Sequence, residues 1–234
     1  MQSYDNMEQI NKNMKNKLSV SMMCSNLVNI EKSIQVLDKI GIDFYHIDIM
    51  DGQFVPNLTF GPDLVNAMRA ITNTPFDIHL LMNYPSVIVR SMDIREGDVV
   101  TVHCECKESI MENVAFIKQK KAQFGLALKP DTTIEEVKKY LPYTDVVNLM
   151  LIVPGFAGST MIRGMMEKVG ETRKYLDKHN YENIEIEVDG SVSCDRAQYM
   201  ASLGANIFVG GTAGIFRKGM KLQDTIPNFY KSIL

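Results

Sequence analysis

The feature that most constrains the fold is a regular alternation of short apolar runs and longer amphipathic stretches from Leu18 to the end of the chain. Parallel strands buried on both faces appear as continuous apolar runs, and the helices that connect them appear as amphipathic segments. The runs predict strands at Leu18–Met23, Phe44–Met50, Phe76–Leu81, Val99–His103, Phe124–Leu128, Val146–Ile152, Ile184–Asp189 and Ile207–Gly210. The stretches after them predict helices at Ile30–Ile40, Asp63–Ala70, Pro85–Met92, Ser109–Lys120, Thr133–Tyr140, Met161–Lys178, Cys194–Leu203 and Leu222–Leu234.

Eight strand–helix units in 234 residues indicate an α/β fold of the closed (β/α)8 type, a TIM barrel, rather than an open doubly wound sheet. The first strand is not followed by G-x-G-x-x-G, which also argues against a dinucleotide-binding fold. We expect one catalytic barrel over residues 18–234. Residues 1–17 are polar and lack a hydrophobic leader, so we expect them to form an N-terminal extension outside the barrel.

Composition excludes several classes of function. The net charge is −3 with Lys and Arg scattered along the chain, which predicts no nucleic-acid partner. No apolar run approaches the roughly 20 residues that span a bilayer, so we expect no membrane partner. The four cysteines form no CxxC pair, and free, mostly buried thiols in a reducing cytoplasm are expected.

Residues 44–62, FYHIDIMDGQFVPNLTFGP, combine one predicted strand with the loop that follows it. His46, Asp48 and Met50 alternate with isoleucines, so on a strand their side chains point to one face. Burying an unpaired carboxylate is costly, and it requires a hydrogen-bonding partner or a cation. Two interpretations are open from this segment: a structural His–Asp hydrogen bond, or two ligands of a metal ion.

Other polar side chains also stand late in predicted strands. The C-terminal ends of TIM-barrel strands meet at one mouth, where the active site lies. That rule brings together Ser21, His46, Asp48, His79, His103, Met150 and Asp189. A single strand-end His is commonly a core residue and a single Asp before Gly is commonly a turn former. Their convergence on one mouth indicates a shared site instead.

The chemically distinctive part of this set is two imidazoles and two carboxylates, from His46, Asp48, His79 and Asp189. Such ligands suit one divalent ion such as Zn, Mn, Fe, Co or Mg. The two aspartates come from well-separated strands, so they can flank a bound molecule. A metal-polarised carbonyl would acidify the adjacent C–H, and one carboxylate would remove the proton while the other returned one to the opposite face. We therefore predict inversion at the carbon beside a ketone. Met50 and Met150 either line this site or pack in the core.

Glycine-rich turns follow the last three units of the predicted barrel. They are Pro154–Gly158 (PGFAG), Asp189–Ser191 (DGS) and Gly210–Gly214 (GGTAG), and each precedes a predicted helix. Backbone N–H groups at a helix N-terminus bind phosphate without Lys or Arg, and a phosphate site near the last loops is common in TIM barrels. The glycines could instead serve only as tight turns. Their clustering favours a phosphorylated substrate.

The segment HIDIMDGQFVPNLT, followed in order by PGFAG, VDGS and GGTAG, resembles the ribulose-phosphate 3-epimerase family over essentially the whole chain from Leu18. The resemblance implies a barrel of the ribulose-phosphate-binding type, epimerisation at C3 of a ketose phosphate, one divalent metal ion and a homo-oligomer. It implies four metal ligands: His46, Asp48, His79 and Asp189.

The resemblance also implies individual roles. Asp48 matches the proton acceptor and Asp189 the proton donor, while Ser21 and His79 match substrate contacts. The positions that match the loops around substrate and phosphate are Gly155, Phe156, Ala157, Gly158, Asp189, Gly190, Ser191, Gly211 and Thr212.

Within the family, several details are closer to D-allulose-6-phosphate 3-epimerases than to the pentose enzymes. These details are SMMCSNL at the first strand, Ala157 in PGFAG, IEVDGS and GTAGIF. We therefore expect interconversion of D-allulose 6-phosphate and D-fructose 6-phosphate. The alternative pair is D-ribulose 5-phosphate and D-xylulose 5-phosphate of the pentose phosphate pathway.

Some positions depart from the family pattern, most of them around the sixth strand. They are Val20, Leu81, Leu151, Val153, Ser159 and Met161. The predicted metal and proton-transfer residues are intact, so the predicted reaction stands. The departures bear on substrate preference and rate.

Two other classes of function, a lyase and a non-catalytic binding protein, fit the sequence less well. A lyase on the same type of barrel, such as a sugar-phosphate or orotidine-phosphate decarboxylase, would carry an Asp-x-Lys-x-x-Asp motif, and the sequence has none. A non-catalytic barrel that binds sugar phosphates would not need the complete set of two imidazoles and two carboxylates.

Overall fold

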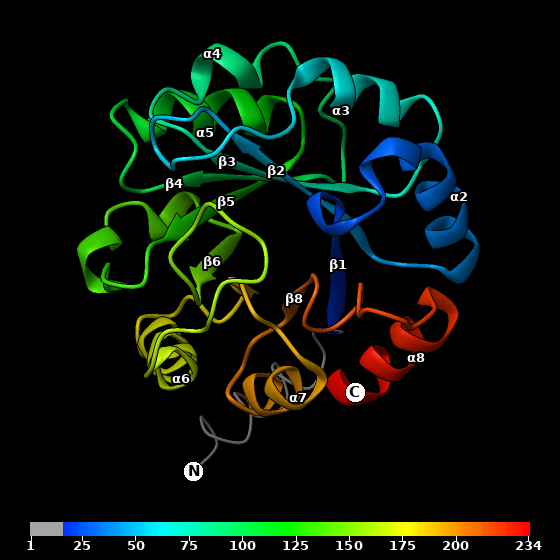
Figure 1. Ribbon diagram of the computed structural model, residues 1–234. Coiled ribbons are helices and arrows are strands. Elements are labelled where there is room, and N and C mark those ends of the chain that lie inside the picture. Colours follow the sequence, from blue (N-terminus) through cyan, green and yellow to red (C-terminus); the bar gives the residue numbers. More distant parts are fainter. Residues whose placement is uncertain (1–15) are drawn as a thin grey trace.

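The fold is a closed barrel of parallel strands surrounded by helices, seen end-on in Figure 1. The computed structural model describes residues 16–234. Eight strands pair in chain order and close the ring through β1 and β8. They are β1 (Lys17–Ser21), β2 (Phe44–Met50), β3 (Phe76–Leu81), β4 (Val99–His103), β5 (Gln123–Leu128), β6 (Val146–Met150), β7 (Glu185–Asp189) and β8 (Ile207–Gly210). The predicted TIM barrel is confirmed.

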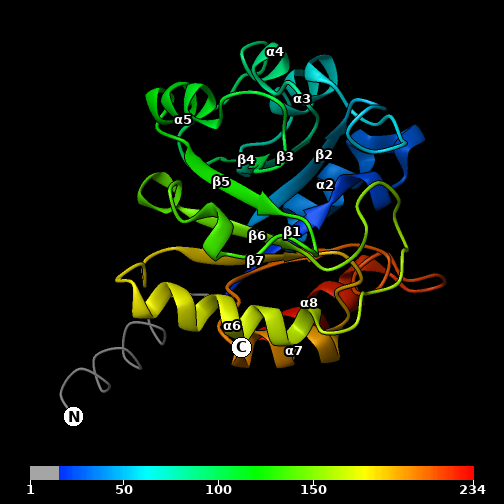
Figure 2. The same cartoon turned by 90° about the vertical axis from the view of Figure 1, so that its left-hand side faces the viewer.

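The connecting helices form the outer layer, and Figure 2 shows α6, α7 and α8 along one side of the strands. The α-helices are α2 (Ile30–Ile40), α3 (Pro62–Arg69), α4 (Ser86–Val89), α5 (Ile110–Gln119), α6 (Met165–Lys178), α7 (Cys194–Ser202) and α8 (Leu222–Ile233). Short 3₁₀ helices are η1 (Met22–Cys24), η2 (Leu27–Asn29), η3 (Glu135–Val137) and η4 (Leu141–Tyr143). Apolar faces of the helices pack on the outer faces of the strands in one continuous core.

The start of the barrel differs slightly from the prediction. Lys17, which was assigned to the N-terminal extension, is the first residue of β1, and its ammonium pairs with Glu185 of β7 at 2.6 Å. The rest of the predicted extension, up to residue 15, lies outside the described residues. β1 also ends at Ser21 rather than Met23, because the chain turns into η1 there.

The predicted fifth helix, Thr133–Tyr140, is wrong: only the single 3₁₀ turn η3 forms in this segment. Beside this turn, the N–H and the hydroxyl of Thr133 both donate to the Glu136 carboxylate, at 2.6 and 2.7 Å. Pro142, which cannot donate a backbone hydrogen bond, follows within η4. α6 likewise begins at Met165 rather than Met161, after Gly164 adopts a left-handed φ of 89°.

The barrel interior changes from apolar to polar along its axis. An apolar layer closes the N-terminal end, built from the first residues of the four even-numbered strands: Phe44, Val99, Val146 and Ile207. Layers of this kind, drawn from alternate strands, are typical of TIM barrels. Residues two positions further along a strand share its inward face, and here they include His46, Thr101 and Asn148, all fully buried. The polar interior therefore lies directly beneath the C-terminal mouth.

Two expectations from composition can be compared with the fold. No helix within residues 16–234 is long and apolar enough to cross a membrane. Cys24, Cys104, Cys106 and Cys194 are free, as predicted, but all four are half-buried rather than buried.

Candidate active site

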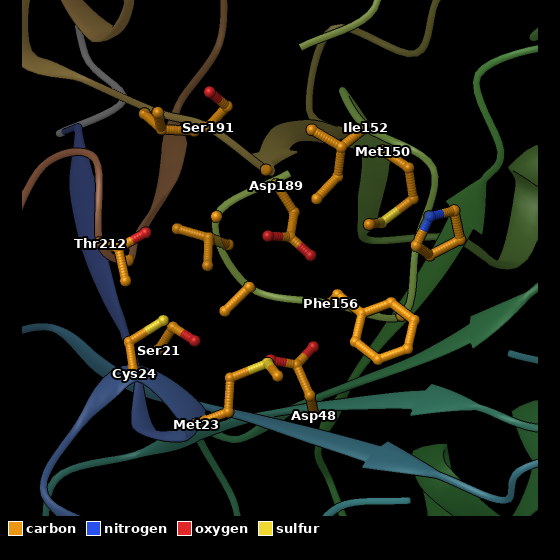
Figure 3. Close-up of a pocket in the computed structure, with 18 of the residues that line it drawn as sticks. Ser21, Met23, Cys24, Asp48, Met150, Ile152, Phe156, Asp189, Ser191 and Thr212 are labelled. Atoms are coloured by element: carbon orange, nitrogen blue, oxygen red, sulfur yellow. The ribbon is translucent and has the colours of Figure 1, made fainter. Parts of the chain in front are cut away.

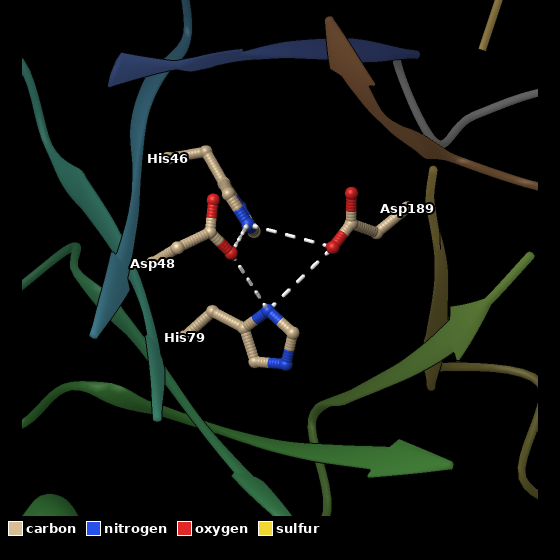
Figure 4. A group of neighbouring side chains, drawn as sticks. All are labelled: His46, Asp48, His79 and Asp189. Atoms are coloured by element: carbon tan, nitrogen blue, oxygen red, sulfur yellow. Dashed lines mark hydrogen bonds and ion pairs between the residues drawn. The ribbon is translucent and has the colours of Figure 1, made fainter. Parts of the chain in front are cut away.

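His46, Asp48, His79 and Asp189 meet at the C-terminal mouth of the barrel (Figure 4). Residues 46 and 48 share the inward face of β2, and the pairing of Asp48 with His79 sets β3 beside them in register. Asp189 arrives from β7, across the barrel. One donor atom from each residue lies within 4.8 Å of the other three. The structure thus brings together the four groups that the sequence placed at separate strand ends.

The contacts are made by specific atoms. Asp48 Oδ1 lies 3.1 Å from His46 Nε2 and 3.2 Å from His79 Nδ1. Asp189 Oδ2 lies 3.7 and 3.5 Å from the same two nitrogens. Both imidazoles are fully buried and Asp48 is 5% exposed. The contacts to the imidazoles are thus made by one oxygen of each carboxylate, Asp48 Oδ1 and Asp189 Oδ2.

Electrostatics within the cluster indicate a need for positive charge. Burial alone would lower the pKa of His46, but the carboxylates of Asp48 and Asp77 outweigh burial and raise it well above the usual value. Burial would raise the pKa of Asp48, but His46 and His79 hold it well below its usual range. Without a cation, the aspartates therefore keep protons on the imidazoles. A divalent ion satisfies the same charge, and two nitrogens with two carboxylate oxygens form a donor set that fits one.

A second polar layer supports the first from below. His46 Nδ1 lies 2.6 Å from Asp77 Oδ2, which also accepts a hydrogen bond from Ser19 Oγ at 2.7 Å. Glu187 Oε1 lies 3.6 Å from the same His46 nitrogen and accepts from Asn148 Nδ2 at 2.9 Å. Because Asp77 accepts the proton at Nδ1, His46 directs Nε2 toward the cluster.

A pocket opens directly above the cluster (Figure 3). Asp48 and Asp189 project into it from opposite walls, and the imidazoles lie beneath its floor. Most of the other residues selected from the sequence line this pocket: Ser21, Met50, Met150, Gly155, Phe156, Ala157, Gly158, Gly190, Ser191, Gly211 and Thr212. The sequence did not single out further lining residues, which include Ile152, Val192 and Val209.

The loop after β2 contacts the PGFAG loop, which lines the pocket. Thr59 ties the loop to β2, since its hydroxyl donates to Asp48 O at 2.5 Å and accepts from Met50 N at 3.1 Å. Asn57 Nδ2 donates to Gly155 O at 2.7 Å, across to the PGFAG loop after β6. Phe156 is 54% exposed at the tip of that loop. The two loops therefore meet at Gly155, which lines the pocket.

The three glycine-rich turns differ from the prediction in one respect. Only Asp189–Ser191 leads almost directly into a helix, α7, which begins at Cys194. The loop that contains Gly158 runs on to Met165 before α6, and the turn after Gly211 folds back on itself with three N–H groups donating to Gly211 O. These two turns contribute loop backbone rather than helix N-termini to the pocket.

The DGS turn has a backbone that glycine alone allows at its centre. Gly190 has φ of 108°, and a Cβ there would lie 2.5 Å from Ile152 Cγ1. Ser191 follows with φ of 57°, a left-handed conformation that is unusual for a serine. Successive residues of this kind turn their N–H groups into a concave site that suits an anion.

Comparison with known proteins identifies the family. A model described as the ribulose-phosphate 3 epimerase family matches residues 17–216. The chain belongs to this family. The family's ribulose-phosphate 3-epimerase from Bacillus subtilis is 32% identical over 197 residues, which cover 84% of this chain and 91% of that protein. Its counterpart from Chlamydia pneumoniae is 35% identical over 207 residues, with 88% and 90% covered.

Solved structures with lower identity share the barrel. Thiamine phosphate pyrophosphorylase from Pyrococcus furiosus has a TM-score of 0.63 at 13% identity, over 94% of this chain and 96% of that one. KGPDC from Streptococcus mutans has a TM-score of 0.65 at 16% identity, over 94% and 97%. These likenesses show the fold alone. Family membership, by contrast, makes this protein an epimerase that acts on a sugar phosphate, an isomerase of carbohydrate metabolism.

Several supporting residues escaped the sequence interpretation, although a signal for them was present. Asp77 precedes His79 by two positions, and Glu187 precedes Asp189 by two. The same alternation that singled out His46 and Asp48 thus occurs on β3 and β7. The deeper member of each pair lies in the supporting layer.

Proposed function

We propose that this epimerase inverts C3 of a ketose phosphate, with Asp48 and Asp189 as the two proton-transfer groups. The observation that carries the proposal is the position of these carboxylates, which project into one pocket from β2 and β7 while the imidazoles lie beneath its floor. Inversion requires removal of a proton from one face of a carbon and delivery to the other. A ketose bound between the two aspartates presents one face of C3 to each.

Each carboxylate has one oxygen for the cluster and one for the substrate. Asp48 Oδ1 and Asp189 Oδ2 face the imidazoles, which leaves Asp48 Oδ2 and Asp189 Oδ1 to accept and donate the proton at C3. Asp48 is ionised, because its pKa is held low, and is suited to accept the first proton. Met50 and Met150 exclude water from the walls around the two carboxylates.

A divalent metal ion would be held by His46 Nε2, His79 Nδ1 and one oxygen from each of Asp48 and Asp189. Such an ion supplies electrostatic stabilisation to the oxygens of an enediolate, which makes the C3 proton easier to remove. Zn, Mn, Fe, Co and Mg all accept ligands of these types. The supporting contact from Asp77 orients the His46 ring whichever ion is bound.

The substrate phosphate is bound by backbone rather than by cationic side chains. Among the described residues that line the pocket, none is Lys or Arg, whereas eight positions belong to the three small-residue loops: Gly155, Ala157, Gly158, Gly190, Ser191, Gly211, Thr212 and Ala213. Oriented backbone amides bind anions without a formal charge. The hydroxyls of Ser191 and Thr212 add donors.

We propose D-ribulose 5-phosphate and D-xylulose 5-phosphate as the substrate pair. The support is that the relatives from Bacillus subtilis and Chlamydia pneumoniae are both named ribulose-phosphate 3-epimerase and are covered almost from end to end. The pair differs only at C3, as the two-carboxylate arrangement requires.

The expected hexulose pair, D-allulose 6-phosphate and D-fructose 6-phosphate, remains the second candidate. The sequence details that are closer to the hexulose enzymes include residues that line the pocket, among them Cys24 of SMMCSNL, Ala157 of PGFAG and Ser191 of IEVDGS. They therefore lie where they can affect which sugar fits. A homo-oligomeric assembly and a cytoplasmic location remain predictions for this chain.

The deciding experiment assays D-ribulose 5-phosphate and D-allulose 6-phosphate side by side with protein of measured metal content. A higher kcat/KM for the pentulose phosphate supports the first pair, and a higher value for the hexulose phosphate supports the second. Removal of the metal by a chelator should abolish either activity, and added Zn²⁺, Mn²⁺, Fe²⁺, Co²⁺ or Mg²⁺ should restore it. Metal-loaded protein that turns over neither sugar would support a barrel that only binds sugar phosphates.

A further inference from the structure

A chain of hydrogen bonds leads from the far side of His79 to a loop outside the barrel. His79 Nε2 lies 2.9 Å from His103 Nε2, and His103 Nδ1 lies 3.1 Å from Glu105 Oε2. Both imidazoles are fully buried. In Figure 4 the second ring nitrogen of His79 points away from the cluster. None of these contacts takes part in the mechanism proposed above.

The two rings meet edge to edge. Their centroids are 5.0 Å apart and their planes are inclined by 26°, whereas their Nε2 atoms are only 2.9 Å apart. The rings therefore touch through these nitrogens rather than through their faces. A contact of this length between two nitrogens is a hydrogen bond that holds one proton.

Glu105 decides which nitrogen carries that proton. An ionised carboxylate only accepts hydrogen bonds, so His103 must hold a proton on Nδ1. A neutral His103 then has a lone pair on Nε2, and His79 must donate from its own Nε2. The His79 nitrogen that can give up its proton to a cation is then Nδ1, which faces Asp48 and Asp189.

The other oxygen of Glu105 is fixed independently. Glu105 Oε1 accepts from Lys129 N at 2.9 Å and from Thr132 Oγ1 at 2.5 Å. Lys168 of α6 holds the same loop, since its ammonium donates to the carbonyl oxygens of Lys129, Pro130 and Thr132 at 3.0, 2.9 and 2.6 Å. The carboxylate therefore cannot turn freely, and only Oε2 is presented to His103.

We infer that His103 and Glu105 are positioning residues that hold His79 in the tautomer with a free Nδ1, ready to bind a divalent cation. The inference deepens the proposed function, because it rests on the metal site described there. His79 does not rely on a carboxylate in direct contact with its outer nitrogen, as His46 does. The position of its proton is fixed instead through a second imidazole, which is hydrogen-bonded to a carboxylate anchored by the loop at 129–132.

Glu105→Gln is the sharpest variant. The donors Lys129 N and Thr132 Oγ1 keep the amide oxygen of the glutamine on their side, so its NH₂ group faces His103 Nδ1. That nitrogen must then accept, the proton of His103 moves to Nε2, and His79 is forced to protonate Nδ1. Thr132→Val is the matched control, because it removes one anchor of Glu105 and leaves the relay intact. His103→Phe retains a ring but removes both hydrogen bonds.

The probe is Co²⁺ alone, titrated into chelator-treated full-length protein and followed by its visible absorption. We expect Glu105→Gln and His103→Phe to weaken Co²⁺ binding about 10- to 100-fold, the range found when partners of metal ligands are removed. Thr132→Val should bind Co²⁺ close to the wild-type value. Wild-type protein that binds no Co²⁺ contradicts the metal site and the inference together. If the wild type binds Co²⁺ and neither Glu105→Gln nor His103→Phe weakens this binding, the inference is contradicted but the metal site is not.

A measurement on the wild-type protein avoids any effect of the variants on folding. Nitrogen-15 NMR of histidine-labelled protein should show His103 as a neutral ring with its proton on Nδ1, both in the metal-free state and with Zn²⁺ bound. A proton on His103 Nε2 in either state overturns the inference.

Discussion

Arg196 donates from a single nitrogen, Nη1, to both the hydroxyl and the carbonyl oxygen of Ser191, at 2.6 and 2.7 Å. Ser191 lines the pocket in a left-handed conformation that serines seldom adopt. Because its hydroxyl oxygen already accepts from Arg196, the hydroxyl hydrogen is free to donate elsewhere, and the pocket is the space before it. The Arg196 guanidinium thus lies behind Ser191, next to the proposed phosphate site, where none of the described lining residues is Lys or Arg.

The first prediction is that Arg196→Met raises KM for the phosphorylated substrate about tenfold or more, with a smaller effect on kcat. Hydrogen bonds from a charged group contribute about 1.5–3 kcal/mol, and here they hold Ser191 in place. Steady-state kinetics on the preferred substrate provides the test. Ser191→Gly removes the hydroxyl but accepts the same backbone, so it should raise KM less. An unchanged KM in Arg196→Met would show that the pair has no role in binding.

The second prediction concerns the two aspartates. Asp189→Asn should lower kcat about 10²- to 10⁴-fold, the usual contribution of a general acid or base. With Asp48 intact, the epimer whose C3 proton faces Asp48 should still exchange that hydrogen with D₂O without being converted. Asp48→Asn should show the opposite preference. Metal content is measured in both variants, because both residues also belong to the cluster.

If Asp189→Asn retains full activity, the two-carboxylate mechanism is wrong. Loss of exchange in both epimers together with loss of bound metal would instead assign Asp189 mainly to metal binding.

The third prediction addresses the contact between the loop after β2 and the PGFAG loop after β6. Asn57→Ala removes the hydrogen bond from Asn57 Nδ2 to Gly155 O and should raise KM several-fold, about the effect of losing 1 kcal/mol of neutral hydrogen bonding. Gln53→Ala is the control, because Gln53 is an exposed residue of the same loop. Equal KM values in the two variants would contradict a role for the contact.

The fourth prediction is a pH dependence. Burial, and then the charge of Asp77, raise the pKa of Glu187 well above the usual value of 4.5. The folded protein therefore retains a proton that the unfolded chain loses above about pH 4.5. The stabilising contribution of this proton is complete below that pH and is lost as the pH rises through the raised pKa.

Glu187→Gln carries no titrating group, so it isolates this contribution. We expect the unfolding free energy of the wild type, minus that of the variant, to fall as the pH rises from below 4.5. Urea unfolding of chelator-treated protein over a pH series measures the difference. A difference that stays constant with pH would mean that Glu187 is ionised in the folded protein.

Strong periodicity made much of the fold predictable. Strands β2, β3, β4 and β8 have the predicted bounds, because continuous apolar runs leave little choice of conformation or register. The amphipathic pattern of Thr133–Tyr140 predicts a helix, but only one 3₁₀ turn forms there, because a local pattern does not include the tertiary contacts of the neighbouring loop, such as those from Lys168.

The sequence by itself determined the barrel and the chemical identity of the four clustered groups, because strand-end position and residue type are both local properties. Only the tertiary structure decided that one oxygen of each of Asp48 and Asp189 faces the imidazoles. It also decided that His46 is hydrogen-bonded to Asp77, and that His79 is hydrogen-bonded to His103, which in turn contacts Glu105. These contacts depend on the register and closure of strands that are far apart in the chain, and on hydrogen bonds whose direction is set by each partner's own neighbours.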